Sequence, residues 1–178
     1  MTDGAIVRVR RYAHDNGPRL IASHGNGFAI DAYWPFLKQF AKRFELVVFD
    51  LRNHGQNPRH LLQNHRIDRF VSDFETILGP FRTRHGARPT VGIFHSISSI
   101  TALLHAIRHG WQWDALVAVD PPLVPPPGHH LYTLAHAAEL RLSDWASSRR
   151  ERFETADEFA GILAKARTNA HWIADAPG

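Results

Sequence analysis

The sequence lacks cysteine altogether and contains a single methionine among its 178 residues. Without cysteine, the protein has no disulfide framework, no thiolate zinc site and no cysteine nucleophile. It also lacks any run of about 18 apolar residues, so no membrane span is expected. The first residues carry scattered charges instead of the apolar core of a signal peptide. These absences favour a globular cytoplasmic protein.

A dense stripe of one charge sign is also missing. The 21 Lys and Arg residues are largely balanced by 17 Asp and Glu residues, which leaves a net charge of +4 and a pI of about 10.0. Short basic runs occur only at 8–11 and 149–152. Nucleic-acid-binding surfaces usually combine denser basic stripes with aromatic residues. Nucleic acid is therefore not an expected partner.

The thirteen histidines show neither an HExxH motif nor a paired ligand spacing. His129 and His130 follow a proline-rich loop, where we expect them to be solvated and not to bind metal. Neither a metal nor another cofactor is expected.

From residue 19 onward, apolar runs alternate with helical patterns. Continuous apolar runs, typical of strands buried on both faces, occur at 19–23, 46–49, 91–94 and 115–119. Helical spacing of apolar residues occurs over 31–42, 67–78 and 97–107. We expect Gly79-Pro80 to stop the second helix, Gly110 to cap the third, and 5–12 to form an edge strand. This order predicts an α/β fold with a doubly wound, mostly parallel sheet.

The pattern changes at 121–127, where five of seven residues are proline. Such a run excludes a strand interior or a helix and predicts a linker. Beyond it only helical patterns occur, at 129–142, 143–153 and 155–167. We therefore divide the chain into an N-terminal core part (1–120), a linker (121–128) and an incomplete helical cap (129–178).

Ser96 stands where the strand pattern at 91–94 passes directly into the helical pattern at 97–107. No turn residues separate the two, so the serine is expected on a sharp corner at the carboxyl edge of the sheet. That geometry is typical of a nucleophile elbow. An alternative is a buried strand followed by a helix that Ser96 caps.

Three more polar loops begin where a predicted strand ends: 24–28, 50–58 and the loop that starts at Asp120. In open parallel sheets, ligands bind beyond the carboxyl ends of the strands. The joint position of these loops with Ser96 favours the elbow over the helix cap.

The loops resemble those of the α/β-hydrolase superfamily. His24-Gly25-Asn26-Gly27 is similar to the oxyanion loop of that family, and His95-Ser96-Ile97 matches the core of its elbow. The segment 50–55 resembles the D-x-R-[GN]-H-G loop, in the Arg-Asn-His-Gly form of small acyl-ester hydrolases. The resemblance covers residues 5–120, and the remainder resembles the start of a cap domain.

The resemblance implies a role for each residue. Ser96 is the expected nucleophile, and the backbone amides of Ile97 and Asn26 are the expected oxyanion donors. Supporting roles in shaping the loops and bracing the elbow fall to His24, Gly25, Gly27, Arg52, His54 and His95.

Two departures from the family pattern stand out. Phe94 occupies a position, two residues before the nucleophile, where the family has a small residue. The second departure is the catalytic base, because the order in the family is Ser, acid, His. Asp120 is a candidate acid, although its Asp-Pro-Pro context also suits a residue that starts a loop. No histidine after the elbow fits the base, and His171 lies in the helical tail without a preceding strand.

The sequence thus predicts a serine hydrolase that acts on a small-molecule carboxylic ester, thioester or related acyl compound, and that is inactive as a truncated chain. The alternative is a non-catalytic α/β-hydrolase-like protein that binds a ligand or a partner. The strand at 115–119 is expected at an open sheet edge, where self-association is possible.

Overall fold

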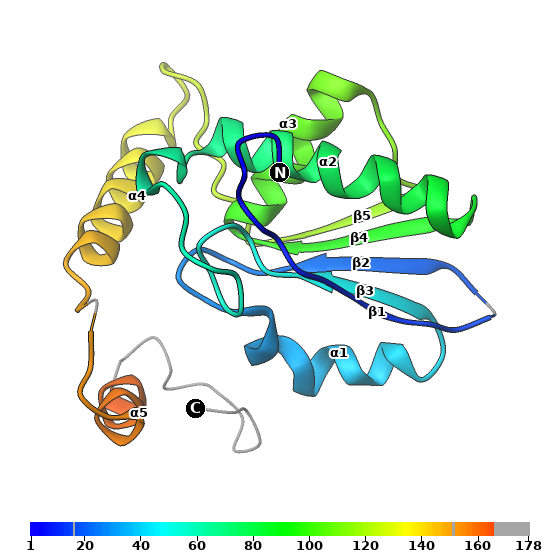
Figure 1. Ribbon diagram of the computed structural model, residues 1–178. Coiled ribbons are helices and arrows are strands. Elements are labelled where there is room, and N and C mark those ends of the chain that lie inside the picture. The colour runs from blue at the N-terminus through cyan, green and yellow to red at the C-terminus, as the bar shows by residue number, and fades with distance from the viewer. Residues whose placement is uncertain (16, 151, 166–178) are drawn as a thin grey trace. The chain divides into compact units, whose positions relative to one another are not determined.

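The computed structural model describes residues 1–15, 17–150 and 152–165 (Figure 1). The chain divides into two compact units, Met1–Pro122 and Leu123–Gly178. The first unit holds the sheet and all of the predicted site residues, and the second holds the helices that follow the proline-rich segment.

The first unit is built on a five-stranded sheet with the order β1-β3-β2-β4-β5. β1 is antiparallel to β3, and the remaining strands are parallel. The strands are β1 (Val9–Tyr12), β2 (Arg19–Ser23), β3 (Glu45–Phe49), β4 (Thr90–His95) and β5 (Ala115–Val119). Because β3 and β4 lie on opposite sides of β2, the chain changes direction across the sheet at β2, which is where such folds bind ligands.

Helices cover both faces of the sheet (Figure 1). A short 3-10 helix, η1 (Ile30–Tyr33), leads into α1 (Trp34–Ala41) on one face. On the other face lie α2 (Ile67–His85), which follows the 3-10 turn η2 (Leu62–Asn64), and α3 (Ile97–His109). This arrangement confirms the predicted doubly wound α/β fold.

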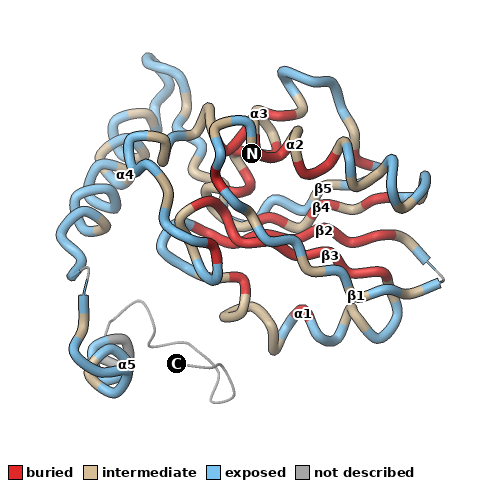
Figure 2. The backbone as a smooth tube through the Cα atoms, viewed as in Figure 1, coloured by how far each residue is buried: buried red, intermediate tan, exposed pale blue. Residues whose placement is uncertain are grey.

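Alternate residues of the central strands supply the two cores. Leu20 and Ala22 of β2 pack in one core cluster with Leu37 of α1. Ile21, between them, belongs to a second cluster with Phe74 of α2. Figure 2 shows the buried residues concentrated along β2 and β3. The continuous apolar runs of these strands therefore reflect burial on both faces, as predicted.

The outermost strands are less buried than the central ones. β1 alternates between exposed and half-buried residues, as predicted, although it is shorter than the segment 5–12. β5 was expected to be buried, and this was wrong, because four of its five residues are exposed. Among the described residues β5 pairs only with β4, so Val117 and Val119 remain accessible.

The prediction that Gly79-Pro80 stops the second helix was also wrong, because α2 continues through Pro80 to His85. A proline inside a helix costs about 3 kcal/mol. Tertiary contacts of the last turns offset that cost, since Phe81 packs against the core and Arg82 hydrogen-bonds to Gln112. The helix ends at Gly86, whose φ of 75° few other residues adopt readily.

In α3 the helical spacing was correct, but the apolar stripe does not mark the buried face. The buried residues are mostly small and polar: Ser98, Ser99, Thr101, Ala102 and His105. Ile107, which belongs to the apolar stripe, is exposed. Small side chains at 98, 99 and 102 let the start of α3 pack closely against the sheet, which a sharp strand-to-helix corner requires.

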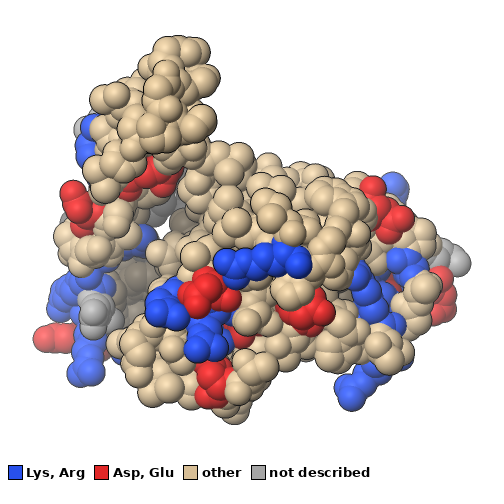
Figure 3. Space-filling view, turned by 90° about the horizontal axis from the view of Figure 1, so that it is seen from above, with Lys and Arg blue, Asp and Glu red and all other residues tan. Residues whose placement is uncertain are grey.

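Charges of both signs are mixed on the surface of the protein. Figure 3 shows basic and acidic side chains next to one another on the face drawn, and pairs such as Arg10–Asp31, 2.6 Å apart, occur in the first unit. None of the helices in the described residues is both long and apolar enough to cross a bilayer.

In the described part of the second unit the helices are α4 (Tyr132–Ser147) and α5 (Ala156–Lys165). The sequence patterns 129–142 and 143–153 were expected to form separate helices. Instead, α4 runs through the expected break between residues 142 and 143. None of the α4 residues is buried.

Candidate active site

Ser96 forms the corner between β4 and α3 in a strained backbone conformation. Its φ of 51° and ψ of −118° are rarely adopted by residues other than glycine. Ser96 occupies the N-cap position of α3, as the alternative expected, but its side chain makes no capping hydrogen bond. Strain of this kind costs about 1–3 kcal/mol and is concentrated at functional sites. Within the described residues, the Ser96 hydroxyl has no hydrogen-bond partner.

Neighbouring hydroxyls and backbone groups hold the corner in place. The Ser98 hydroxyl donates to the His95 carbonyl at 2.9 Å and accepts from the His95 amide at 3.0 Å. The Ser99 hydroxyl donates to the Phe94 carbonyl at 2.5 Å. The amide of Ser96 itself donates to the Val119 carbonyl of β5 at 2.9 Å. The nucleophile position is therefore fixed from both α3 and β5.

Phe94 does not distort the corner, because Gly92 leaves room for its ring. The ring is fully buried, with its centroid 5.2 Å from Phe74 and 5.4 Å from Trp113. A Cβ atom at Gly92 would lie only 2.7 Å from Cε2 of Phe94. In the family pattern, a small residue at position 94 leaves space at the elbow. Here Gly92, two residues earlier on the same strand, leaves that space instead.

The predicted oxyanion loop lies directly against the nucleophile. A Cβ atom at Gly25 would be 3.2 Å from Cβ of Ser96 and 2.7 Å from Nδ1 of His95. Fully buried His24 anchors the start of the loop, since its Nδ1 donates to the Gly25 carbonyl at 2.8 Å and its Nε2 accepts from the Leu51 amide at 3.1 Å. Asn26 and Gly27 are exposed, so the loop presents its backbone beside Ser96.

Tyr33 links this loop to the elbow. Its hydroxyl lies 2.6 Å from Nδ1 of His95 and accepts a hydrogen bond from the Gly25 amide at 3.4 Å. Burial raises the pKa of Tyr33, so the phenol is neutral at pH 7. Tyr33 could not be identified from the sequence, because one tyrosine in a predicted helix carries no distinct signal.

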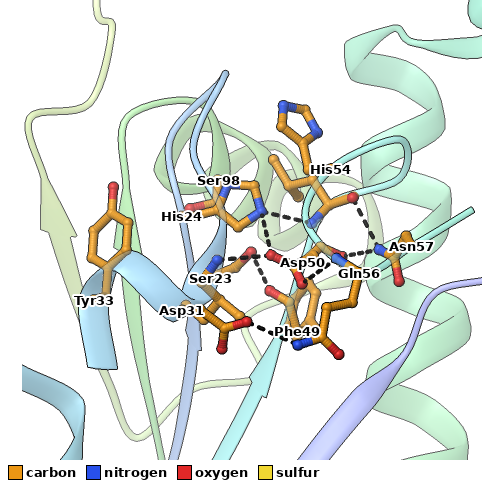
Figure 4. Close-up of polar contacts among 12 residues, drawn as sticks. Ser23, His24, Asp31, Tyr33, Phe49, Asp50, His54, Gln56, Asn57 and Ser98 are labelled. Carbon is orange, nitrogen blue, oxygen red and sulfur yellow. Dashed lines mark hydrogen bonds and ion pairs between the residues drawn. The ribbon is translucent and has the colours of Figure 1, made fainter. Parts of the chain in front are cut away.

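Asp50 is the centre of the second strand-end loop (Figure 4). Its buried carboxylate accepts from the Ile30 amide at 2.7 Å and lies 3.3 Å from Nε2 of His24. Burial raises the pKa of Asp50, but the adjacent His24 ring and the hydrogen bond from the Ile30 amide outweigh it and keep the pKa below its ordinary value. Asp50 is thus a charged acceptor that joins the oxyanion loop to β3.

Gly55 leads to a first prediction. Its φ is 53°, and a Cβ atom there would lie 2.3 Å from Cγ of Asp50. We expect Gly55→Ala to lower the free energy of unfolding, measured by urea denaturation, by about 2–4 kcal/mol. The backbone strain of a positive φ and the steric clash with the buried Asp50 carboxylate both contribute to this loss. Gly86→Ala is the matched control, since Gly86 has a φ of 75° with nothing within 4 Å. An equal loss in both variants would show that the contact with Asp50 contributes nothing.

Arg52, in the same strand-end loop, anchors this loop to its neighbours. Its buried guanidinium donates to Asp73 of α2 through two nitrogens, each at 2.6 Å, and to Asp3 at 2.7 Å. The hydrogen bond from Arg52 holds the pKa of Asp3 well below its usual range. Arg52 therefore ties together the loop, α2 and the first residues of the chain.

His54 connects the second loop to the oxyanion loop. Its Nδ1 donates to the Arg52 carbonyl at 2.9 Å, and its Nε2 accepts from the Gly27 amide at 3.0 Å. Burial lowers the pKa of His54 to about 4, so the ring is neutral at pH 7. Its Nε2 therefore keeps the lone pair that accepts the hydrogen bond from the Gly27 amide. With both nitrogens engaged, His54 is placed to position Gly27.

Asp120 lies beside the elbow, because it follows Val119, which pairs with His95. It is exposed and has a φ of 45°, another strained conformation. Burial lowers the pKa of His95, and the negative charge of Asp120 partly opposes that shift. Asp120 is thus close to the predicted nucleophile, while its role as the acid stays a prediction.

The described residues do not place a base on Ser96. His95 precedes it, but Nδ1 of His95 is engaged with Tyr33. His171, which the sequence analysis did not assign as the base, lies outside the described residues. The site therefore combines a strained serine, a close glycine-rich loop and a nearby carboxylate.

Comparison with known families agrees with this geometry. Residues 16–177 match the family described as serine aminopeptidase, S33, whose fold is that of the α/β-hydrolases. The chain belongs to the α/β-hydrolase superfamily. No curated protein matches the chain significantly.

Solved α/β-hydrolase structures share the fold. The thioesterase domain of the curacin biosynthetic pathway is 16% identical with a TM-score of 0.67, and the match covers 93% of this chain and 59% of that domain. A hydrolase from Pseudomonas aeruginosa is 19% identical (TM-score 0.61, 92% and 56%). An α/β-hydrolase fold protein from Burkholderia ambifaria is 18% identical (TM-score 0.59, 91% and 54%). The chain thus spans little more than half the length of these structures.

Proposed function

We propose that the protein is a hydrolase that cleaves a carboxylic ester, thioester or related acyl compound through an acyl-enzyme on Ser96. The observation that carries this proposal is the strained conformation of Ser96, whose hydroxyl is left unused by the helix that follows. Strain at one serine, next to a glycine-rich loop at the same sheet edge, is what a nucleophile elbow requires. The esterase and thioesterase among similar structures support an acyl substrate.

In the proposed reaction, Ser96 Oγ attacks the carbonyl carbon of the substrate while a general base takes the hydroxyl proton. The developing oxyanion accepts hydrogen bonds from the amides of Ile97 and Asn26, each worth about 2.7–4 kcal/mol. Collapse of the tetrahedral intermediate releases the alcohol or thiol, which takes up the proton, and leaves the acyl group on Ser96. Water then attacks the acyl-enzyme in the reverse sense and releases the acid.

Two further groups fit this scheme. We assign the acid that orients the base to Asp120, since its carboxylate is exposed and follows the strand next to the elbow. Phe28, which is 37% exposed and lies edge-on to His95 and Tyr33, supplies an apolar wall beside Ser96 for the acyl group.

Covalent labelling with a fluorophosphonate tests the proposal. We expect the full-length protein to gain one adduct by intact mass, located on Ser96 by peptide mapping. Ser96→Ala is expected to reduce labelling to background and ester turnover by roughly 10³-fold or more. Ser148→Ala removes an exposed serine that directly follows α4 and is the matched control, with labelling equal to that of the wild type.

The competing function is a non-catalytic binding protein, which the absence of a base on Ser96 among the described residues favours. Folded full-length protein that resists the fluorophosphonate and hydrolyses no acyl ester would contradict the hydrolase proposal and favour this alternative.

A further inference from the structure

Away from the elbow, α2 and α3 pack side by side and bring three metal-binding side chains together. Glu75 comes from α2, and His105 and His109 come from the last turns of α3. Within the described part of the chain, this is the one group of three or more histidine and carboxylate side chains whose ligand atoms all lie within 4.8 Å of one another. The two histidines are four residues apart, so they project from the same side of the helix.

The separations are close to those that a tetrahedral metal requires. Nε2 of His105 is 2.7 Å from Oε2 of Glu75, and Nδ1 of His109 is 3.8 Å from the same oxygen. Ligands about 2.0–2.1 Å from a tetrahedral Zn²⁺ are separated by roughly 3.3 Å. The two observed distances bracket this value. Side-chain rotation can close the remaining difference, because Glu75 and His109 are 43% and 37% exposed.

We propose that Glu75, His105 and His109 form a binding site for a divalent transition metal, with Zn²⁺ as the metal that fits best. Two imidazoles and one carboxylate are a ligand set that Zn²⁺ favours in proteins, and water completes the tetrahedron at the exposed side. The group lacks the six or more oxygen ligands that Ca²⁺ requires.

His105 is the fixed ligand of the three. Its ring is fully buried, its Nε2 faces Glu75 at 2.7 Å, and the other ring nitrogen, Nδ1, has no hydrogen-bond partner. A buried polar atom without a partner costs folding free energy, and an apolar residue would fill this position without that cost.

The site is structural and not catalytic. His105 lies nine residues after Ser96 on the same helix, which corresponds to roughly 13 Å along the axis. A metal at this position joins α3 to α2, so it stabilises the helix that begins at the elbow without contacting the substrate. Binding to the folded state raises the unfolding temperature according to the ratio of free metal to Kd.

Calorimetric titration of the chelator-treated full chain with ZnCl₂ tests the site. We expect one Zn²⁺ per chain and an increase in the unfolding temperature. Glu75→Gln and His109→Ala change partly exposed residues, so both variants are expected to fold, and each is expected to weaken Zn²⁺ binding by about tenfold or more. His129→Ala removes an exposed histidine of the second unit and is the matched control, with binding unchanged.

Three results would overturn the proposal. The first is folded wild-type protein that gives neither heat nor a shift in unfolding temperature in a roughly tenfold molar excess of Zn²⁺. The second is unchanged binding in both Glu75→Gln and His109→Ala. The third is loss of binding in His129→Ala, which would assign the metal to the exposed pair His129 and His130. Fluorophosphonate labelling of Ser96 is independent of all three results, so the hydrolase proposal and the metal-site proposal are tested separately.

Discussion

Replacing Arg52 by methionine is expected to lower the free energy of unfolding at pH 7 by about 3–5 kcal/mol. The guanidinium is buried and makes charge-assisted hydrogen bonds to both Asp73 and Asp3. Methionine fills much of the volume but leaves two carboxylates without their cation. Breaking a buried ion pair by removing one partner is costly because the remaining charge is uncompensated.

The pH dependence of this variant follows from the carboxylates. Arg52 lowers the pKa of Asp3 in the folded state, so the stabilisation is present above the unfolded pKa of about 3.9 and is lost as the pH falls below it. In Arg52→Met the orphaned carboxyls instead take up protons on acidification, which relieves their repulsion. The difference in unfolding free energy between wild type and variant should therefore shrink as the pH falls through about 4.

Urea denaturation at several pH values measures this difference. Arg66→Met is the matched control, because Arg66 pairs with Asp68 at 3.0 Å with both side chains about half exposed. Exposed pairs contribute at most about 1 kcal/mol. If Arg52→Met cost no more than the control, the buried bridge between α2 and the strand-end loop would be unimportant.

Phe94→Ala is expected to cost about 3–5 kcal/mol, because it removes a fully buried ring from the core beneath the elbow. Gly92→Ala is expected to cost about 1–3 kcal/mol by overpacking, since its new Cβ would meet the Phe94 ring at 2.7 Å. In the double variant the alanine at 92 enters space that the ring has left. The combined loss should therefore be smaller than the sum of the two single losses.

A double-mutant cycle in urea measures the coupling between positions 92 and 94. Residues that share one space usually couple by about 0.5–3 kcal/mol, whereas independent sites add within about 0.5 kcal/mol. Strict additivity would contradict the conclusion that Gly92 compensates for the bulky residue at the elbow.

The fold and the position of Ser96 could be predicted because their signals are local. An apolar run such as 46–49 needs no partner to indicate a buried strand, and each strand-end loop follows its strand directly in the sequence. The parallel arrangement then places the loops together at one edge of the sheet.

The errors arose where tertiary contacts decide. Pro80 predicts the end of a helix, but α2 continues beyond it because the tertiary contacts of Phe81 and Arg82 stabilise its last turns. β5 has the composition of a buried strand, yet burial depends on neighbours that the described residues do not provide.

The proposed metal site could not be predicted from the sequence for a related reason. The expectation of no metal held that no paired ligand spacing is present and so overlooked His105-x-x-x-His109, and the third proposed ligand, Glu75, lies on another helix, thirty residues away from His105. Only the packing of α2 against α3 brings the three side chains together.

The contacts of His54 have a practical consequence for any assay of this protein. Gly27 is held by His54, His54 by the Arg52 carbonyl, and the Arg52 side chain by Asp3. The beginning of the polypeptide is thus mechanically coupled to the loop beside Ser96. Any change that disturbs the Asp3 carboxylate is therefore expected to affect the loop beside Ser96.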